Sequence, residues 1–404
     1  MIIINKHMQS LNYRKHKQVT LSVKLRTFFT LSCLVFIMAG CQTTTQSSPT
    51  KLTKKEYFLI GNMSPNEHHG VTLISLDQQK LTLNNEGIIA DAQLGSYIAL
   101  TKNHKNLFTV IADNVGGVNH FKWHPEQQKY LLEQSIKVSG KGTCHVALNH
   151  DESQLVISNY RSGDVHLFDI NKNNQHLTEI GYFKNTPKDQ KAIHQYPRMH
   201  YSNWDNSGKY LYSVDLGTDE IKVFNSQNRE FTPTVAAQLA DGDGPRHLAF
   251  HPSQNIVYAL NEFSSDVVVY QQDMANGQLK PIQRLTALPA TYKTGDVPKI
   301  AASAIRISPD GKFLYAGVRG INAIAVFSIA DNGTLNMIQS QSSLADWPRD
   351  LNFSAQANYL LVANKRANIV TVLARDVKTG LLSATDMALE LPIPSVITNF
   401  NILK

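Results

Sequence analysis

One pattern recurs six times along this chain of 404 residues, and this repeat constrains the fold more than any other feature of the sequence. The clearest copy is RHLAFHPSQNIVYALNEFSSDVVVY at 246–270. It consists of a short apolar run, a polar turn, a second apolar run, a polar loop and a third run in which apolar and polar residues alternate. Further copies begin at residues 97, 144, 199, 303 and 349. A chain that repeats one unit in this way is expected to build its fold from equivalent modules.

Each unit is expected to be a small antiparallel β-sheet. The turns carry SPDGK, DNSGK or HPSQN, which are rich in residues that favour tight turns, and the runs are rich in Val, Ile, Tyr and Phe. A fourth strand fits into the gap between copies, as in KPIQRLTAL at 280–288. Four short strands in a unit of about 50 residues are typical of a β-propeller blade.

The two ends of the repeated region supply one further unit. YFLIGN at 57–62 and VTLISLD at 71–77 provide strands at one end, and SVITNFNIL at 395–403 provides a strand at the other. Pairing between these segments would close a ring. We therefore predict an all-β fold over residues 56–404, a seven-bladed β-propeller of four-stranded blades closed by pairing of its N- and C-terminal segments.

The repeat also predicts a site. In an antiparallel hairpin the start of the first strand and the end of the second lie on the same rim, so Arg246 and His247 should meet Glu262 near the central channel. The matching positions of the other copies add His145, His200, Arg319, Arg349 and Lys365. Titratable groups that converge in a pocket favour a functional site, whereas the structural alternative is a set of solvated loop charges and strand-capping histidines. We expect the rim itself to be solvated.

These motifs resemble the lactonase family of seven-bladed propellers, which includes bacterial 6-phosphogluconolactonase and fungal carboxymuconate-cyclising enzymes. The resemblance covers roughly residues 57–400, and its most specific part is the run GPRHLAFHP…NE that begins at Gly244. It implies a catalytic site composed of His200, Arg246, Glu262 and Arg319. The residues expected to bind substrate are His145, Arg198, His247, Arg349 and Lys365.

The sequence departs from the family pattern at three positions. Arg198 stands where the family often has a first histidine, Ala304 replaces a frequent glutamate, and Val318 replaces the asparagine that often precedes Arg-Gly. These departures indicate a pocket that is adapted to another ligand or weakened.

Lactone hydrolysis requires a water molecule made nucleophilic and a developing oxyanion that is stabilised. His200 or Glu262 could act as the base, while Arg246 and Arg319 could hold the carbonyl oxygen and any acidic group of the substrate. The histidines lack close paired spacing with carboxylates, so we expect no metal, and no other cofactor is implied. Cys144 is expected to be a small buried residue rather than a nucleophile.

Three functions fit these features. The first is a lactone hydrolase, similar to 6-phosphogluconolactonase, that acts as a monomer on a sugar-derived lactone or acidic sugar derivative. The second is a non-catalytic envelope propeller that binds a ligand or a protein partner, because one fold hosts many functions. The third is a cycloisomerase that forms a lactone.

The N-terminal region predicts export. Residues 1–40 hold six Lys or Arg and no acidic residue, and without them the chain has 33 basic against 32 acidic residues, so nucleic-acid binding is not indicated. KLRTFFTLSCLVFIMAGC at 24–41 reads as a secretory signal whose end resembles a bacterial lipobox, with Cys41 as the lipidated residue. Residues 41–55 follow as a polar tether, and Gln42 favours the outer membrane, facing the periplasm. A cytoplasmic substrate such as 6-phosphogluconolactone does not suit this location.

Overall fold

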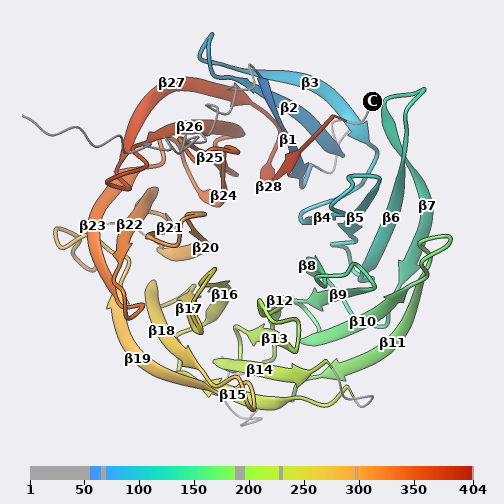
Figure 1. Ribbon diagram of the computed structural model, residues 1–404, viewed down its shortest axis with the longest axis horizontal. Coiled ribbons are helices and arrows are strands. Elements are labelled where there is room, and N and C mark those ends of the chain that lie inside the picture. Colours follow the sequence, from blue (N-terminus) through green and yellow to red (C-terminus); the bar gives the residue numbers. More distant parts are fainter. Residues whose placement is uncertain are drawn as a thin grey trace, which may run out of the picture. The chain divides into compact units, whose positions relative to one another are not determined.

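The computed structural model describes residues 55–64, 70–186, 196–226, 231–295, 297 and 299–402. They all belong to one compact unit, and every regular element in them is a β-strand (Figure 1). Residues 1–54, which contain the signal sequence, Cys41 and nearly all of the tether, lie outside the described part. The described residues contain no helix long and apolar enough to cross a membrane.

Seven four-stranded antiparallel blades surround a common centre (Figure 1). The outermost strands of the first two blades are joined by a single parallel pair, Ala90 with Tyr130. From the centre outwards, the first three blades contain β28 (Pro394–Phe400), β1 (Lys55–Asn62), β2 (Val71–Asp77) and β3 (Thr82–Ala90); β4 (Ile98–Leu100), β5 (Asn106–Val110), β6 (Gly117–His124) and β7 (Lys129–Lys137); and β8 (Thr143–Leu148), β9 (Gln154–Asn159), β10 (Asp164–Ile170) and β11 (Leu177–Lys184).

The remaining four blades follow the same order around the ring. Their strands are β12 (Met199–Trp204), β13 (Tyr210–Asp215), β14 (Glu220–Asn225) and β15 (Thr234–Gln238); β16 (Pro245–Phe250), β17 (Ile256–Asn261), β18 (Asp266–Gln272) and β19 (Leu279–Thr286); β20 (Ala301–Ile307), β21 (Phe313–Arg319), β22 (Ala323–Ile329) and β23 (Leu335–Ser342); and β24 (Pro348–Phe353), β25 (Tyr359–Asn364), β26 (Ile369–Arg375) and β27 (Leu382–Glu390). The prediction of seven four-stranded blades is confirmed.

The ring closes through the two ends of the repeated region. β28 forms the innermost strand of the first blade and pairs antiparallel with β1, from Tyr57 opposite Phe400 to Gly61 opposite Val396. The innermost strands also contact one another around the whole circle, in the order β28, β4, β8, β12, β16, β20, β24 and back to β28. The predicted closure by N- and C-terminal segments is therefore confirmed (Figure 1).

The core consists of apolar clusters that lie between neighbouring blades, because each strand buries side chains on both of its faces. Buried tyrosines of the second strands add a polar tie to the next blade. Each hydroxyl donates to the carbonyl oxygen of a glycine in a left-handed turn, at 2.6–2.9 Å; the pairs are Tyr212 with Gly277, Tyr258 with Gly333 and Tyr315 with Gly380. The repeat therefore specifies the blades and also the contacts between them.

Candidate active site

The inner strands place four side chains at the centre by the same local distortion. In four blades the first residues of the inner strand shift register against the second strand, and one residue is left out of the ladder. A β-bulge of this kind turns a side chain to a new direction. The extruded residues are Cys144, His200, Arg246 and Arg349, and all four line one cavity of about 220 Å³.

The bulges correct the alignment of the repeats. When the copies of the repeat are aligned by sequence, Met199 stands at the same position as Cys144, Arg246 and Arg349. In the structure, the equivalent of these three residues is His200. Met199 instead pairs with Asp215 and is buried in the blade. The sequence shows the apolar pattern of the strand, which is the same in both alignments, and gives no sign of where the ladder shifts.

An ion-pair network forms one wall of the cavity. Arg246 Nε lies 2.9 Å from Glu262 Oε2, and Arg319 Nη2 lies 3.0 Å from the same oxygen. Both guanidinium groups are also fixed by main-chain oxygens, since Arg246 Nη1 donates to Ser303 O and Arg319 Nη2 to Ala302 O, each at 2.6 Å. The predicted meeting of Arg246 with Glu262 across the hairpin is thus observed, and Arg319 joins them.

The expectation of a solvated rim is wrong at this network. Arg246 is only 2% exposed and Arg319 only 5%. Burial raises the pKa of Glu262, but Arg319 and Arg246 outweigh it and hold the net pKa below its usual value. Burial lowers the pKa of Arg319 to about 10, although Glu262 acts in the opposite direction. The wall is therefore a desolvated, charged arrangement in which electrostatic interactions are stronger than in water.

Two further cations lack a counter-ion. Within the described residues, the side chains of Arg349 and Lys365 make no hydrogen bond or ion pair. Burial and Arg246 lower the pKa of Arg349 to about 10, and burial with Arg349 and Arg319 lowers the pKa of Lys365 to about 8. Arg349 lines the cavity, whereas Lys365 is not among the residues that line it. This side of the site carries an excess of positive charge.

His200 provides a neutral imidazole on the cavity wall. Its ring lies 5.7 Å from that of Tyr160 and 5.2 Å from that of His247. Burial, followed by Arg246 and Arg349, holds the pKa of His200 well below its usual value, so the ring is uncharged at neutral pH. Its Nδ1 is buried and has no partner among the described residues, which leaves Nε2 as the nitrogen able to meet a molecule in the cavity.

His145 and His247 are buried and do not line the cavity. Their rings pack with Tyr97 and Tyr201 at centroid distances of 4.3–6.3 Å. Arg246 Nη1 lies 3.1 Å from His247 Nε2, which accepts this hydrogen bond because a guanidinium only donates. Burial lowers the pKa of His145 to about 3 and holds that of His247 well below normal. Neither of these two predicted binding residues therefore lines the cavity.

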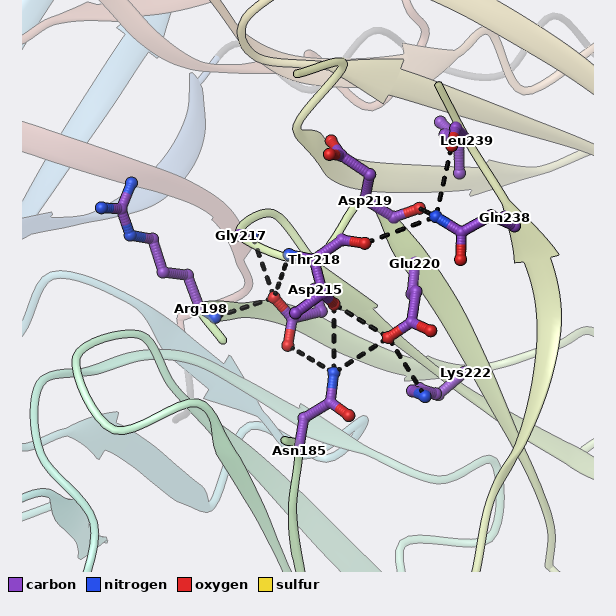
Figure 2. A network of polar contacts seen from close by, with 10 residues as sticks. All are labelled: Asn185, Arg198, Asp215, Gly217, Thr218, Asp219, Glu220, Lys222, Gln238 and Leu239. Atoms are coloured by element: carbon purple, nitrogen blue, oxygen red, sulfur yellow. Dashed lines mark hydrogen bonds and ion pairs between the residues drawn. The ribbon is translucent and has the colours of Figure 1, made fainter. Parts of the chain in front are cut away.

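Arg198 is held at the margin of the site by a buried carboxylate. Its main-chain N–H donates to Asp215 Oδ1 at 2.8 Å, and the same oxygen accepts the N–H groups of Gly217 and Thr218 (Figure 2). The side chain of Arg198 extends away from this network (Figure 2), and its guanidinium lies 5.8 Å from the centroid of the Tyr160 ring. The network fixes the segment that leads into β12, and with it the position of His200.

The other departures from the family pattern do not fall on the cavity wall. Ala304 is fully buried in the core between β20–β23 and β24–β27, and Val318 is fully buried in the core between β16–β19 and β20–β23. Cys144 does line the cavity, but burial raises the pKa of its thiol to about 12, which opposes formation of a thiolate. Within the described residues, no group of three or more His, Cys, Asp or Glu could hold a metal ion.

Sequence reasoning missed some of the cavity wall. Tyr160, Gly142 and Arg161 line it beside the predicted residues. Met63, which directly follows β1, is also part of the wall. Tyr160 stands in the same column of the repeat as Glu262, at the end of the second strand, so the repeat places it on the rim, although it is not among the predicted site residues.

Comparison with known proteins agrees with the fold. The family model described as lactonase, 7-bladed beta-propeller, matches residues 57–399, so the chain belongs to the lactonase family of seven-bladed β-propellers. It is 26% identical to a 6-phosphogluconolactonase of Bacillus subtilis over 337 residues, which are 83% of this chain and 95% of that protein. It is 30% identical to a 6-phosphogluconolactonase of Formosa agariphila over 302 residues, 71% of this chain and 83% of that protein. The crystal structure of a putative 6-phosphogluconolactonase from Bacteroides fragilis superposes with a TM-score of 0.77 at 25% identity, covering 88% of this chain and 100% of that one.

Proposed function

We propose that this protein is a lactone hydrolase that opens a sugar-derived lactone by attack of water in the central cavity. The observation that carries the proposal is the Arg246–Glu262–Arg319 network beside the neutral His200, in one cavity of a lactonase-family propeller. The named relatives support the reaction class.

His200 is the proposed general base. Glu262 is a poor candidate, because two guanidinium groups bond one of its oxygens and stabilise its charged form. The neutral His200 can accept a proton from water through Nε2 while the water oxygen bonds to the lactone carbonyl carbon. The ring C–O bond then breaks, and the same proton passes from His200 to the departing ring oxygen. The product is an open hydroxy acid.

Arg246 and Arg319 are proposed to stabilise the oxyanion of the tetrahedral intermediate. Glu262 holds both groups in place before the substrate arrives, so little reorganisation is needed as the charge develops. A low-dielectric wall strengthens this effect. Arg349 is proposed to bind an acidic group of the substrate, with Lys365 adding positive charge behind it, because neither cation has a protein partner among the described residues. The proposed substrate class is therefore a lactone that carries a carboxylate or a phosphate.

A panel of neutral and acidic aldonolactones tests the function, with ring opening followed by acid release. We expect turnover by the wild type and a loss of roughly 10²-fold or more in His200→Ala. A neutral His200 is required, and its pKa is depressed, so kcat should stay nearly constant as pH falls through about 6.5, where an ordinary histidine would be half protonated. As pH rises through about 8, Lys365 loses its charge, and KM should rise for acidic lactones only.

The control for this assay is Lys365→Met, which should lose the alkaline rise in KM and leave kcat for neutral lactones unchanged. Lactone opening at equal rates by the wild type and His200→Ala would contradict the assigned base. Ligand binding in the cavity without turnover of any lactone would favour the non-catalytic binding protein instead, and net formation of a lactone would favour the cycloisomerase.

We further propose that the protein is exported and anchored through a lipid on Cys41. The support is the sequence alone, namely the apolar run and the small residues before this cysteine. Radiolabelled palmitate should enter the wild type and be absent from Cys41→Ser, with Cys33→Ser as the matched control that keeps the label. Equal labelling of the wild type and Cys41→Ser would exclude this anchor.

A further inference from the structure

The segment before the inner strand has the same backbone conformation in four blades. In each of these blades, one residue just before the inner strand has a left-handed φ. The carbonyl oxygen of that residue accepts the N–H of the residue that follows the second strand. The residues, with φ and with the donor in brackets, are Gly142 at 66° (Tyr160), Gly244 at 61° (Glu262), Trp347 at 71° (Lys365) and Ile393 at 43° (Met63). The conformation therefore recurs at this position of the blade, and glycine adopts it without strain.

Trp347 is unusual at such a position. A left-handed φ is rare for bulky side chains, and strain of this kind is often retained for a function. The loop around Trp347 is itself well fixed, since its N–H donates to Asn322 Oδ1 at 2.9 Å and Asn322 Nδ2 donates to Asp346 at 2.9 Å. The backbone conformation is thus enforced by the loop, and the choice of a tryptophan needs a reason of its own.

The indole of Trp347 lies close to two guanidinium groups. Its ring centroid is 5.3 Å from Cζ of Arg319 and 3.2 Å from Cζ of Arg366, and the side chain is only 7% exposed. Trp347 is not part of the cavity wall, so it has no direct contact with a bound substrate. Its indole approaches the site through Arg319.

The hydrogen bonds of the Arg319 guanidinium lie in its plane and do not cover its two faces. Its N–H groups are directed to Ala301 O, Ala302 O and Glu262 Oε2, at 2.6–3.0 Å. These bonds hold the edge of the guanidinium and leave its faces to be covered by packing or by water. An indole over one face excludes water and adds a cation–π attraction.

We propose that Trp347 is a positioning residue, whose indole fixes the guanidinium of Arg319 against Glu262 and keeps it dry. The inference rests on the proposed function only in that Arg319 takes part in lactone opening. If the proposal is correct, the strained backbone at residue 347 is retained because the site needs the indole, and not because the ring needs it for stability.

Trp347→Gly removes the indole without straining the backbone, because glycine is the residue that Gly142 and Gly244 already place at this position. We expect kcat to fall roughly tenfold with KM little changed, and the melting temperature to fall as well, because the loss of a buried indole outweighs the relief of backbone strain. Trp347→Phe should recover most of kcat, because it keeps an aromatic face. Ile393→Gly is the matched control, since it relieves the same kind of strain in the blade of β28, keeps the carbonyl that bonds Met63 and should leave kcat unchanged.

A crystal structure of Trp347→Gly provides a readout that does not depend on turnover. The proposal expects the separation of 3.0 Å between Arg319 Nη2 and Glu262 Oε2 to be lost or the guanidinium to become disordered. An unchanged ion pair, or a wild-type kcat in Trp347→Gly, would overturn it. If the wild type opens no lactone, the proposed function fails, and the crystal structure still decides the role of Trp347.

Discussion

A protein that lacks residues 393–404 is expected to lose the cooperative unfolding transition of the wild type. The deletion removes β28, the innermost strand of the blade that closes the ring. Val396, Ile397 and Phe400 are at most 3% exposed and belong to the two clusters on either side of this blade. Losing buried side chains of this size costs about 2–5 kcal/mol each, which together approaches the whole stability of a typical domain, about 5–15 kcal/mol. The deletion also exposes the edge of β1 to pairing with other chains.

Circular dichroism and calorimetry measure this effect directly. The deletion variant should show no sharp melting transition and should aggregate, whereas a chain that ends at Ile402, beyond β28, should melt like the wild type. Melting of the deletion variant at the temperature of the wild type would show that the ring does not depend on pairing of its two ends.

Loss of Arg246 is expected to have the largest effect on the site. Its guanidinium contacts Glu262, the carbonyl of Ser303 and the imidazole of His247, and it is almost fully buried. Arg246→Ala leaves these acceptors short of a donor, so we expect kcat/KM to fall by about 10²–10³-fold, or about 3–4 kcal/mol. Stability should fall as well, by about 3–5 kcal/mol, because a buried charge loses its partner.

A second variant separates activity from stability. Arg246→Lys keeps the charge but cannot reproduce the two-sided contact of a guanidinium, so activity should remain low while much of the stability returns. Arg375→Lys is the matched control, because Arg375 is equally buried and bonds Tyr315 and Ala357 O away from the cavity. It should lower the melting temperature without changing kcat. Full activity in well-folded Arg246→Lys would show that the planar fork is not required.

The fold could be predicted from the sequence because each copy of the repeat carries its own strands and turns. HLAF and IVYAL at 247–250 and 256–260 have the length and composition of strands, and the turn between them selects an antiparallel pair. The closure of the ring could be predicted because six copies of the repeat are complete, and the strand around Val396 is left to pair with the strands at the other end of the repeated region. These are local signals, repeated often enough to confirm one another.

The site could be predicted only in part, because it depends on departures from the regular strand. The meeting of Arg246 and Glu262 follows from hairpin geometry, and the structure shows it. The bulge that brings His200 to the cavity has no signature in the apolar pattern. The burial of Arg246 depends on the neighbouring blades, and the contribution of Trp347 depends on a backbone angle. None of these is encoded within a single copy of the repeat.

The direction of β1 has a consequence for how the protein can be presented. Met63, just after the end of β1, lines the cavity, while Lys55 at its start lies eight residues earlier along an extended strand, about 25 Å away on the other rim. Lys55 therefore lies on the rim remote from the mouth of the cavity. A molecule fixed to a sensor chip through that rim leaves the mouth open to the surrounding solution. Small molecules can then reach it without passing between the protein and its support.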